Sequence, residues 1–226
     1  LWAHGTSGFT DACAPTADPQ GYAVPVILAA LGYVTVAPDY LGMNGWGAPA
    51  GFVHPYIVPE PTAIATLDSL RALVRFAGDT GEALPSSPGK DIVLFGASEG
   101  GFATLWTDRI APYYAPEFSF VANVAAVPPT DAIGLTQHGT SVFGPTTGAL
   151  AAAIVGGHTW HQVSEPLTDV LAAMAAADRG SADGDKLWPF AVLELHGMID
   201  PADASLPTTA RLLRSREDDI RHVPKS

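Results

Sequence analysis

The pentapeptide that most constrains the fold of this chain is GASEG, at residues 96–100. It follows the apolar segment Ile92–Phe95 and precedes a stretch of helical character that extends to Tyr114. A turn that passes directly from a strand into a helix is so tight that the residues two before and two after its centre must lack bulk, and both are glycine here. The pentapeptide therefore predicts a strand, a sharp turn with Ser98 at its apex, and a helix.

The position of Ser98 at this turn has a chemical consequence. Its hydroxyl would project beyond the end of the sheet and lie at a helix N-terminus, where backbone N–H groups and the helix dipole favour a developing anion. This is the nucleophile elbow of serine hydrolases that have the α/β-hydrolase fold. We expect Ser98 to be a catalytic nucleophile; the alternative is a glycine-rich turn of another α/β fold.

Four apolar segments are predicted to be buried parallel strands, because strands covered on both faces are almost continuously hydrophobic. They are Tyr33–Ala37, Ile92–Phe95, Phe120–Val127 and Phe190–Leu195. Helical periodicity separates them, most clearly over Pro61–Ala77, where apolar residues recur at three- and four-residue steps. The alternation predicts an α/β-hydrolase fold with a mostly parallel sheet flanked by helices.

Residues 131–187 interrupt this alternation. They are rich in Gly, Ala, Thr and His and carry only short helical patterns. We interpret them as an inserted cap, expected above the carboxyl ends of the strands, where ligands bind in open α/β sheets. The hydrolase core would then comprise residues 1–130 and residues 188–226.

An acyl-transfer serine needs donors for the oxyanion that forms in the transition state. One donor in this fold is the backbone N–H of the residue after the nucleophile, here Glu99, and the other comes from the loop after an earlier strand. Residues 4–8, His-Gly-Thr-Ser-Gly, have the character of that loop. We expect the amides of Glu99 and Thr6 to bind the substrate oxyanion, although a glycine turn without a catalytic role would give the same letters.

The acid that orients the catalytic histidine should follow the next-to-last strand, because the order in this fold is serine, acid, histidine. Asp200 follows the predicted strand Phe190–Leu195 and is the candidate acid. Asp203 is a poorer second because it lies nearer the following helix. A helix cap or a solvated loop carboxylate is the alternative role of Asp200.

The catalytic histidine has two candidates. His222 is the only late histidine in the chain, but the 222 − 200 = 22 positions after Asp200 are few for a loop, a helix and a whole strand. The chain also begins within an apparent strand, at Leu1 rather than Met. We therefore expect a fold incomplete at both ends, with the histidine either His222 or a residue beyond Ser226.

Several motifs together resemble the secretory lipases of the lipase A type. They are His4–Gly8, Cys13-Ala14-Pro15, Ala37-Pro38-Asp39-Tyr40, His54-Pro55-Tyr56 and GASEG, in this order. The resemblance covers residues 1–130 and implies a lipase or esterase with a cap, often secreted, with Ser98 as nucleophile and Asp200 as acid. The chain departs from the usual elbow of that family at Ala97, where His is common, and at Glu99, where Gln is common.

Composition narrows the possible partners. The net charge of −12 disfavours nucleic acid and anionic lipid headgroups. No apolar segment approaches the length of a membrane span. His158 and His161 have no acidic or cysteine residue spaced with them, so we expect no metal and no other cofactor. Asp39 and His54 are interpreted as structural residues that hold loops.

The expected activity is cleavage of carboxylic esters through an acyl-enzyme on Ser98. The apolar, weakly charged cap favours a small hydrophobic ester or a lipid as substrate; the oligomeric state is left open. A serine peptidase of the same fold is one alternative, because a glycine pair follows Glu99. The other is an inactive hydrolase scaffold that acts as a binding protein.

Overall fold

A computed structural model of the chain describes residues 1–9, 13–17, 19–43, 52–79, 88–141, 145–164 and 167. The chain divides into two compact units, residues 1–130 and residues 131–226. The first unit contains a three-stranded sheet. The described part of the second unit contains two helices, α4 (Ala132–Ser141) and α5 (Pro145–Trp160).

The sheet is parallel, with the strand order β1-β2-β3. The strands are β1 (Trp2–Ala3), β2 (Asp91–Ala97) and β3 (Ser119–Ala126). In the pairing register, Gly96 lies opposite both Ala3 and Ala125. The carboxyl ends of the three strands therefore meet at one edge of the sheet, where ligands bind in open α/β folds.

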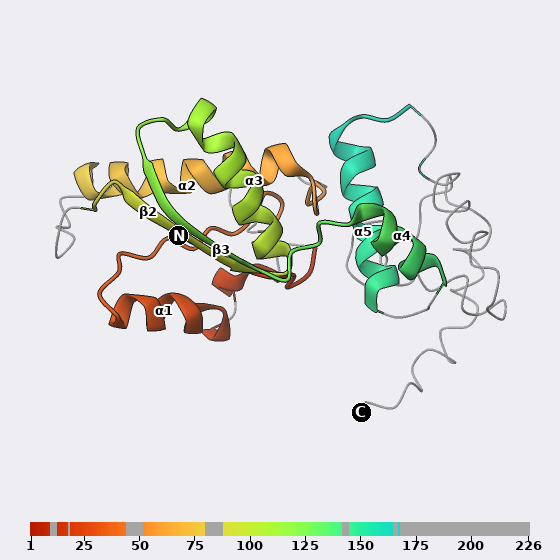
Figure 1. Ribbon diagram of the computed structural model, residues 1–226, viewed down its shortest axis with the longest axis horizontal. Coiled ribbons are helices and arrows are strands. Elements are labelled where there is room, and N and C mark those ends of the chain that lie inside the picture. The colour runs from red at the N-terminus through yellow and green to blue at the C-terminus, as the bar shows by residue number, and fades with distance from the viewer. Residues whose placement is uncertain are drawn as a thin grey trace. The chain divides into compact units, whose positions relative to one another are not determined.

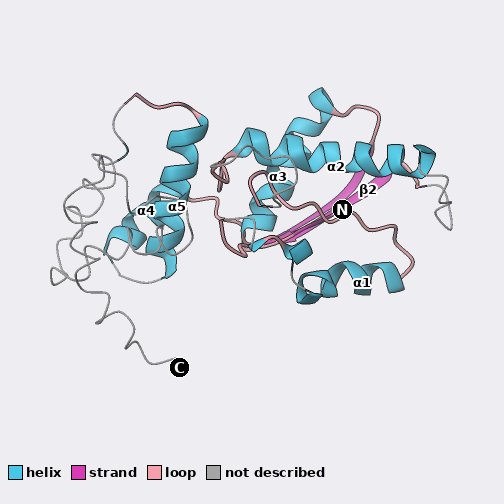
Figure 2. Ribbon diagram, turned by 180° about the vertical axis from the view of Figure 1, so that it is seen from behind, coloured by secondary structure: helices cyan, strands magenta, loops and turns pink. Residues whose placement is uncertain are grey.

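Helices lie on both sides of this sheet. On one side are α2 (Pro59–Asp79) and α3 (Glu99–Tyr114), and on the other is α1 (Ala23–Ala30) (Figures 1 and 2). Two 3₁₀-helices, η2 (Pro15–Ala17) and η3 (Pro19–Tyr22), lead into α1. The layered arrangement confirms the predicted α/β class, and α2 extends the predicted helix by two residues at each end.

The core of the first unit lies between the sheet and the helices α2 and α3. Leu67 and Leu70 of α2 pack in one buried cluster with Ile92 and Leu94 of β2 and with Ala111 of α3. Leu67 and Leu94 are completely buried. Burial of one such side chain stabilises a fold by about 1.5–3 kcal/mol, so this cluster fixes β2 and with it the start of α3.

Two strand predictions need correction. The structure has no strand at Tyr33–Ala37; that segment has no regular secondary structure and meets β1 through one backbone bond, from the Trp2 N–H to the Val36 carbonyl (2.8 Å). This one bond does not make a ladder, so the segment is not a strand. The structure does confirm β3, but most of its side chains are exposed rather than covered, and β3 lies at one edge of the described sheet. The predicted strand Phe190–Leu195 lies outside the described residues.

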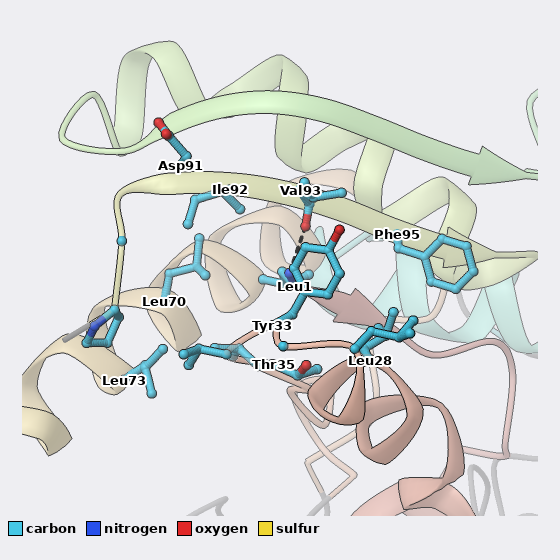
Figure 3. Close-up of a pocket in the computed structure, with 16 residues that line it drawn as sticks. Leu1, Leu28, Tyr33, Thr35, Leu70, Leu73, Asp91, Ile92, Val93 and Phe95 are labelled. Atoms are coloured by element: carbon cyan, nitrogen blue, oxygen red, sulfur yellow. Dashed lines mark hydrogen bonds between the residues drawn. The ribbon is translucent and has the colours of Figure 1, made fainter. Parts of the chain in front are cut away.

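A cavity of about 530 Å³ lies between α1, α2 and the first residues of β2. Leu28, Leu70 and Phe95 are among the apolar side chains that line it (Figure 3). The N-terminal nitrogen of Leu1 donates a hydrogen bond to the Val93 carbonyl at its wall (2.7 Å). Neither Ser98 nor the loop at residues 4–8 belongs to its lining, so the cavity is separate from the candidate site.

Candidate active site

Ser98 occupies the turn between β2 and α3. Its backbone has φ 55° and ψ −122°, a left-handed φ that a residue with a side chain rarely adopts. Two backbone bonds hold it there: its N–H donates to the Ala126 carbonyl (2.9 Å), and its carbonyl accepts from the Phe102 N–H (3.0 Å). The side chain is exposed, so the hydroxyl is accessible to a substrate.

The two flanking glycines make this turn possible. A Cβ atom at Gly96 would lie 2.3 Å from the Gly100 carbonyl oxygen, and one at Gly100 would lie 2.0 Å from the Ala3 carbonyl oxygen. Both distances are far below van der Waals contact, and both involve backbone that cannot move aside cheaply. The absence of side chains therefore lets α3 begin directly against β1 and β2.

The loop after β1 lies against Ser98. A Cβ atom at Gly5 would be 3.3 Å from the Ala97 carbonyl oxygen and 3.9 Å from the Ser98 Cβ. The backbone around Gly5 is thus adjacent to the elbow, while the next residue, Thr6, is exposed. The fold brings together residues that are more than ninety positions apart in the sequence.

Two tyrosine hydroxyls are hydrogen-bonded to this loop. The Tyr40 hydroxyl donates to the His4 carbonyl (2.9 Å), and the Tyr56 hydroxyl is bonded to Thr6 Oγ1 (2.8 Å). His4 Nδ1 lies 2.7 Å from the Gly5 carbonyl oxygen and must donate to it. The His4 and Tyr40 rings also pack with centroids 4.2 Å apart. The loop at residues 4–8 is therefore anchored at both its first and its third residue.

Burial fixes the charge states of these anchoring groups. It lowers the pKa of His4 below its ordinary value, which keeps the imidazole neutral near pH 7. It also raises the pKa of Tyr56 to about 12 and the pKa of Tyr40 well above 10, with the nearby Glu99 carboxylate as a second cause in both. Both phenols therefore stay protonated and able to donate.

The side chain of Glu99 is buried directly behind the elbow. It is 2% exposed, and its Oε1 lies 3.2 Å from Nε2 of His54, which is 1% exposed. The other imidazole nitrogen of His54, Nδ1, lies 2.7 Å from the Leu41 carbonyl oxygen. The first residue of α3 is thus tied by its side chain to the segment that precedes α2.

The structure places some of the predicted site residues together. Ser98, Glu99 and the Gly5–Thr6 segment meet at the carboxyl ends of β1 and β2. Asp200, Asp203 and His222 lie outside the described residues, so their roles stay predictions. The predicted cap at residues 131–187 lies only partly within the described residues and also stays a prediction.

Sequence reasoning gave Asp39 and His54 structural roles and assigned nothing to Tyr40 or Tyr56. Asp39 does hold a loop, since its carboxylate accepts hydrogen bonds from the backbone N–H (3.2 Å) and from the hydroxyl of Thr16. The contact of His54 with Glu99 was missed. The sequence feature that could have indicated this contact is that His54 and Tyr56 belong to one of the motifs that resemble secretory lipases.

Within the described ranges, no three His, Cys, Asp or Glu residues are grouped so that they could hold a metal ion. A search of the same ranges finds no helix that combines the length and the apolar character needed to cross a bilayer.

Comparison with known proteins gives concordant results. Residues 20–169 match the family model described as "Secretory lipase". Lipase 7 of Candida albicans is 34% identical over 94 residues, which are 42% of this chain and 19% of that protein. The chain therefore spans about one fifth of the length of this curated relative.

Two solved structures share the fold. A protein described as a hydrolase, from Legionella pneumophila, superposes with a TM-score of 0.60 at 23% identity. The match covers 95% of this chain and 56% of the Legionella chain. Lipase A of Candida antarctica in its closed state gives a TM-score of 0.55 at 21% identity. The match covers 83% of this chain and 44% of the lipase A chain. At these identities the likeness establishes the fold.

Proposed function

This chain belongs to the secretory lipase family, and from that premise we propose that it hydrolyses carboxylic esters through an acyl-enzyme on Ser98. Residues 132–164, within the predicted cap, contain no Asp, Glu, Lys or Arg, which favours a neutral, hydrophobic acyl group, as in a small ester or a lipid. Membership of the family also supports secretion of the protein. The proposed reaction needs no metal and no cofactor.

The reaction has two steps. Ser98 Oγ attacks the acyl carbon while its proton passes to a histidine, either His222 or one beyond Ser226, which Asp200 orients. The amides of Glu99 and Thr6 hold the oxyanion, and the alcohol leaves with the proton from the histidine. Water then attacks the acyl-enzyme, with the histidine as base, to release the acid and regenerate Ser98.

One observation carries this proposal. An exposed serine is held at φ 55° where β2 passes into α3, and a glycine loop lies directly against it. A strained backbone at an exposed polar side chain is more often retained for function than for packing. We infer that amides of this loop bind the oxyanion that an acyl-transfer reaction would form at Ser98.

The experiment combines a fluorophosphonate probe with hydrolysis of a short-chain nitrophenyl ester by the full-length protein. The probe phosphorus should bond to Ser98 Oγ with loss of fluoride, and Ser98→Ala should abolish both labelling and turnover while circular dichroism stays unchanged. Ester turnover by Ser98→Ala would refute the nucleophile. Absence of labelling and turnover in the unsubstituted protein would favour the inactive scaffold, and turnover of peptides but not esters would favour the peptidase.

The orienting acid is tested by a matched pair of substitutions. Asp200→Asn should lower kcat by about 10⁴, because the amide would favour the wrong imidazole tautomer, whereas Asp203→Asn should change kcat little. Similar mild effects of both substitutions would remove Asp200 from the mechanism. In the same assay, unchanged turnover by His222→Ala would place the histidine elsewhere in the protein.

A further inference from the structure

The hydrogen bonds of His54 require a proton between this side chain and Glu99. A carbonyl oxygen only accepts, so Nδ1 of His54 must donate to the Leu41 carbonyl at 2.7 Å. In a neutral imidazole the other nitrogen, Nε2, is then an acceptor, and a carboxylate oxygen also only accepts. The 3.2 Å contact between Nε2 and Glu99 Oε1 is therefore a hydrogen bond only when the pair holds one further proton.

The surroundings of the pair favour retention of this proton. Both side chains are almost completely buried, and Glu99 Oε2 has no hydrogen-bond partner among the described residues. A carboxylate with one unpartnered oxygen is costly to bury, and facing an imidazole lone pair would cost more. A single shared proton removes the repulsion between the imidazole lone pair and Oε1 and makes the pair neutral overall, which lowers the cost of burying Oε2 without a partner.

The backbone of Glu99 connects this pair to the chemistry. Glu99 is the first residue of α3, next to Ser98, and its N–H is the proposed oxyanion donor. We propose that His54 and Glu99, sharing one proton, form a positioning pair that holds the Glu99 amide in place for the oxyanion. This inference rests on the proposed ester hydrolysis and adds to it a residue, His54, on a segment 45 positions away.

Other titratable groups beside the pair do not change charge between about pH 7 and 10. Among the described residues, those that interact electrostatically with Glu99 are His4, Tyr40 and Tyr56. Burial lowers the pKa of His4 and raises the pKa of both tyrosines, so His4 stays neutral and the phenols stay protonated throughout this range. A change of activity or stability in this range that depends on residue 99 is therefore attributable to the pair.

The substitution Glu99→Gln keeps the hydrogen bond to His54 but removes the titratable proton, so it tests the effect of the proton alone. The amide of Gln can donate an N–H to Nε2 of a neutral imidazole without a titratable proton. In the unsubstituted protein kcat should fall at alkaline pH as the shared proton is lost, and Glu99→Gln should remove this part of the pH profile. His54→Ala should lower kcat about 10- to 100-fold with KM changed less than about threefold, because the oxyanion contact is made in the transition state.

The control is Thr66→Val. Thr66 is completely buried on α2 and donates to the Thr62 carbonyl (2.7 Å), away from the elbow. Its substitution removes a buried hydrogen bond and should leave the shape of the pH profile unchanged. If His54→Ala lowers stability as Thr66→Val does but keeps kcat, or if Glu99→Gln and the unsubstituted protein have parallel pH profiles, the proposal is overturned.

A second readout does not need activity. A pair that shares one proton binds, above about pH 7, one proton more than the same two groups in the unfolded chain, where His and Glu hold none. The folding equilibrium constant of the unsubstituted protein should therefore fall about tenfold per pH unit relative to Glu99→Gln, until the folded pair loses its proton. Urea denaturation from pH 7 to 10 measures this. Equal slopes would overturn the shared proton even if the protein hydrolyses esters, and a difference in slope would support it even if no ester is cleaved.

Discussion

At the scale of single residues, the elbow depends on the absence of side chains as much as on Ser98. The backbone of Ser98 is strained, and the strain persists because the surrounding structure fixes it through bonds to Ala126 and Phe102. Gly100 is the residue that lets α3 start against β1, since its Cα lies where any Cβ would meet the Ala3 carbonyl. The candidate nucleophile is thus positioned by packing that a single methyl group would disturb.

Gly100→Ala tests this steric requirement. The added Cβ would lie 2.0 Å from the Ala3 carbonyl oxygen, so β1 or α3 must shift. We expect a loss of about 1–3 kcal/mol in the free energy of unfolding and a lower kcat, measured by urea denaturation and ester hydrolysis. Gly89→Ala is the control, because no atom of the described residues lies within 4 Å of its Cβ position, and it should change stability by less than about 1 kcal/mol.

At the scale of elements, the packing of α2 and α3 on β2 determines where the elbow lies. Arg71 links α2 to the C-terminal end of α3 and the residues just after it: its Nε donates to Glu117 (2.7 Å) and its Nη2 to the Tyr114 carbonyl (2.6 Å). These contacts are near the surface and exposed charges contribute little to stability. The buried leucines of α2 should contribute much more, since each removes a whole side chain from water.

Leu67→Ala measures the contribution of that layer. Leu67 is completely buried among β2 and α3 side chains, so truncation leaves a cavity and should cost about 2–5 kcal/mol of unfolding free energy. Val74→Ala, on the same helix at a 52% exposed position, should cost less than about 1 kcal/mol. Comparable losses for both would mean that the layer is not the main source of stability.

At the scale of the whole molecule, the net charge bears on which surfaces the protein can approach. A charge of −12 repels anionic lipid headgroups, and this repulsion acts over about 10 Å at 0.1 M salt. An ester-hydrolysing protein with this charge should therefore work better on neutral than on anionic lipid surfaces.

Vesicle experiments test this expectation with the same ester dissolved in two kinds of membrane. At low ionic strength, hydrolysis in phosphatidylcholine vesicles should be at least about threefold faster than in vesicles with about one fifth phosphatidylserine. The difference should disappear near 1 M salt, where screening acts within about 3 Å. Faster hydrolysis on the anionic vesicles would contradict the electrostatic argument and would indicate a local basic surface.

Some features of the fold could be predicted from the sequence because their causes are local. The run of apolar residues before GASEG and the periodicity of residues 61–77 predict β2, α3 and α2, all of which the structure contains. The prediction failed at Tyr33–Ala37, because an apolar segment forms a strand only where a neighbouring strand pairs with it, and this segment meets β1 through the single bond from Trp2 to Val36. That neighbour is a tertiary property which no local pattern contains.

The same distinction applies to the candidate site. The sequence alone determined that Ser98 lies at a tight turn from strand to helix, since a Cβ at Gly96 would meet the nearby Gly100 carbonyl, which is a matter of local sterics. The need for glycine at position 100 comes instead from the distant Ala3 carbonyl. Only the tertiary structure decided what surrounds it: Tyr56 bonded to Thr6 across 50 positions and His54 bonded to Glu99 across 45. Such contacts depend on how β1, β2 and the segment before α2 pack together, and packing depends on shape complementarity between distant side chains rather than on spacing along the chain.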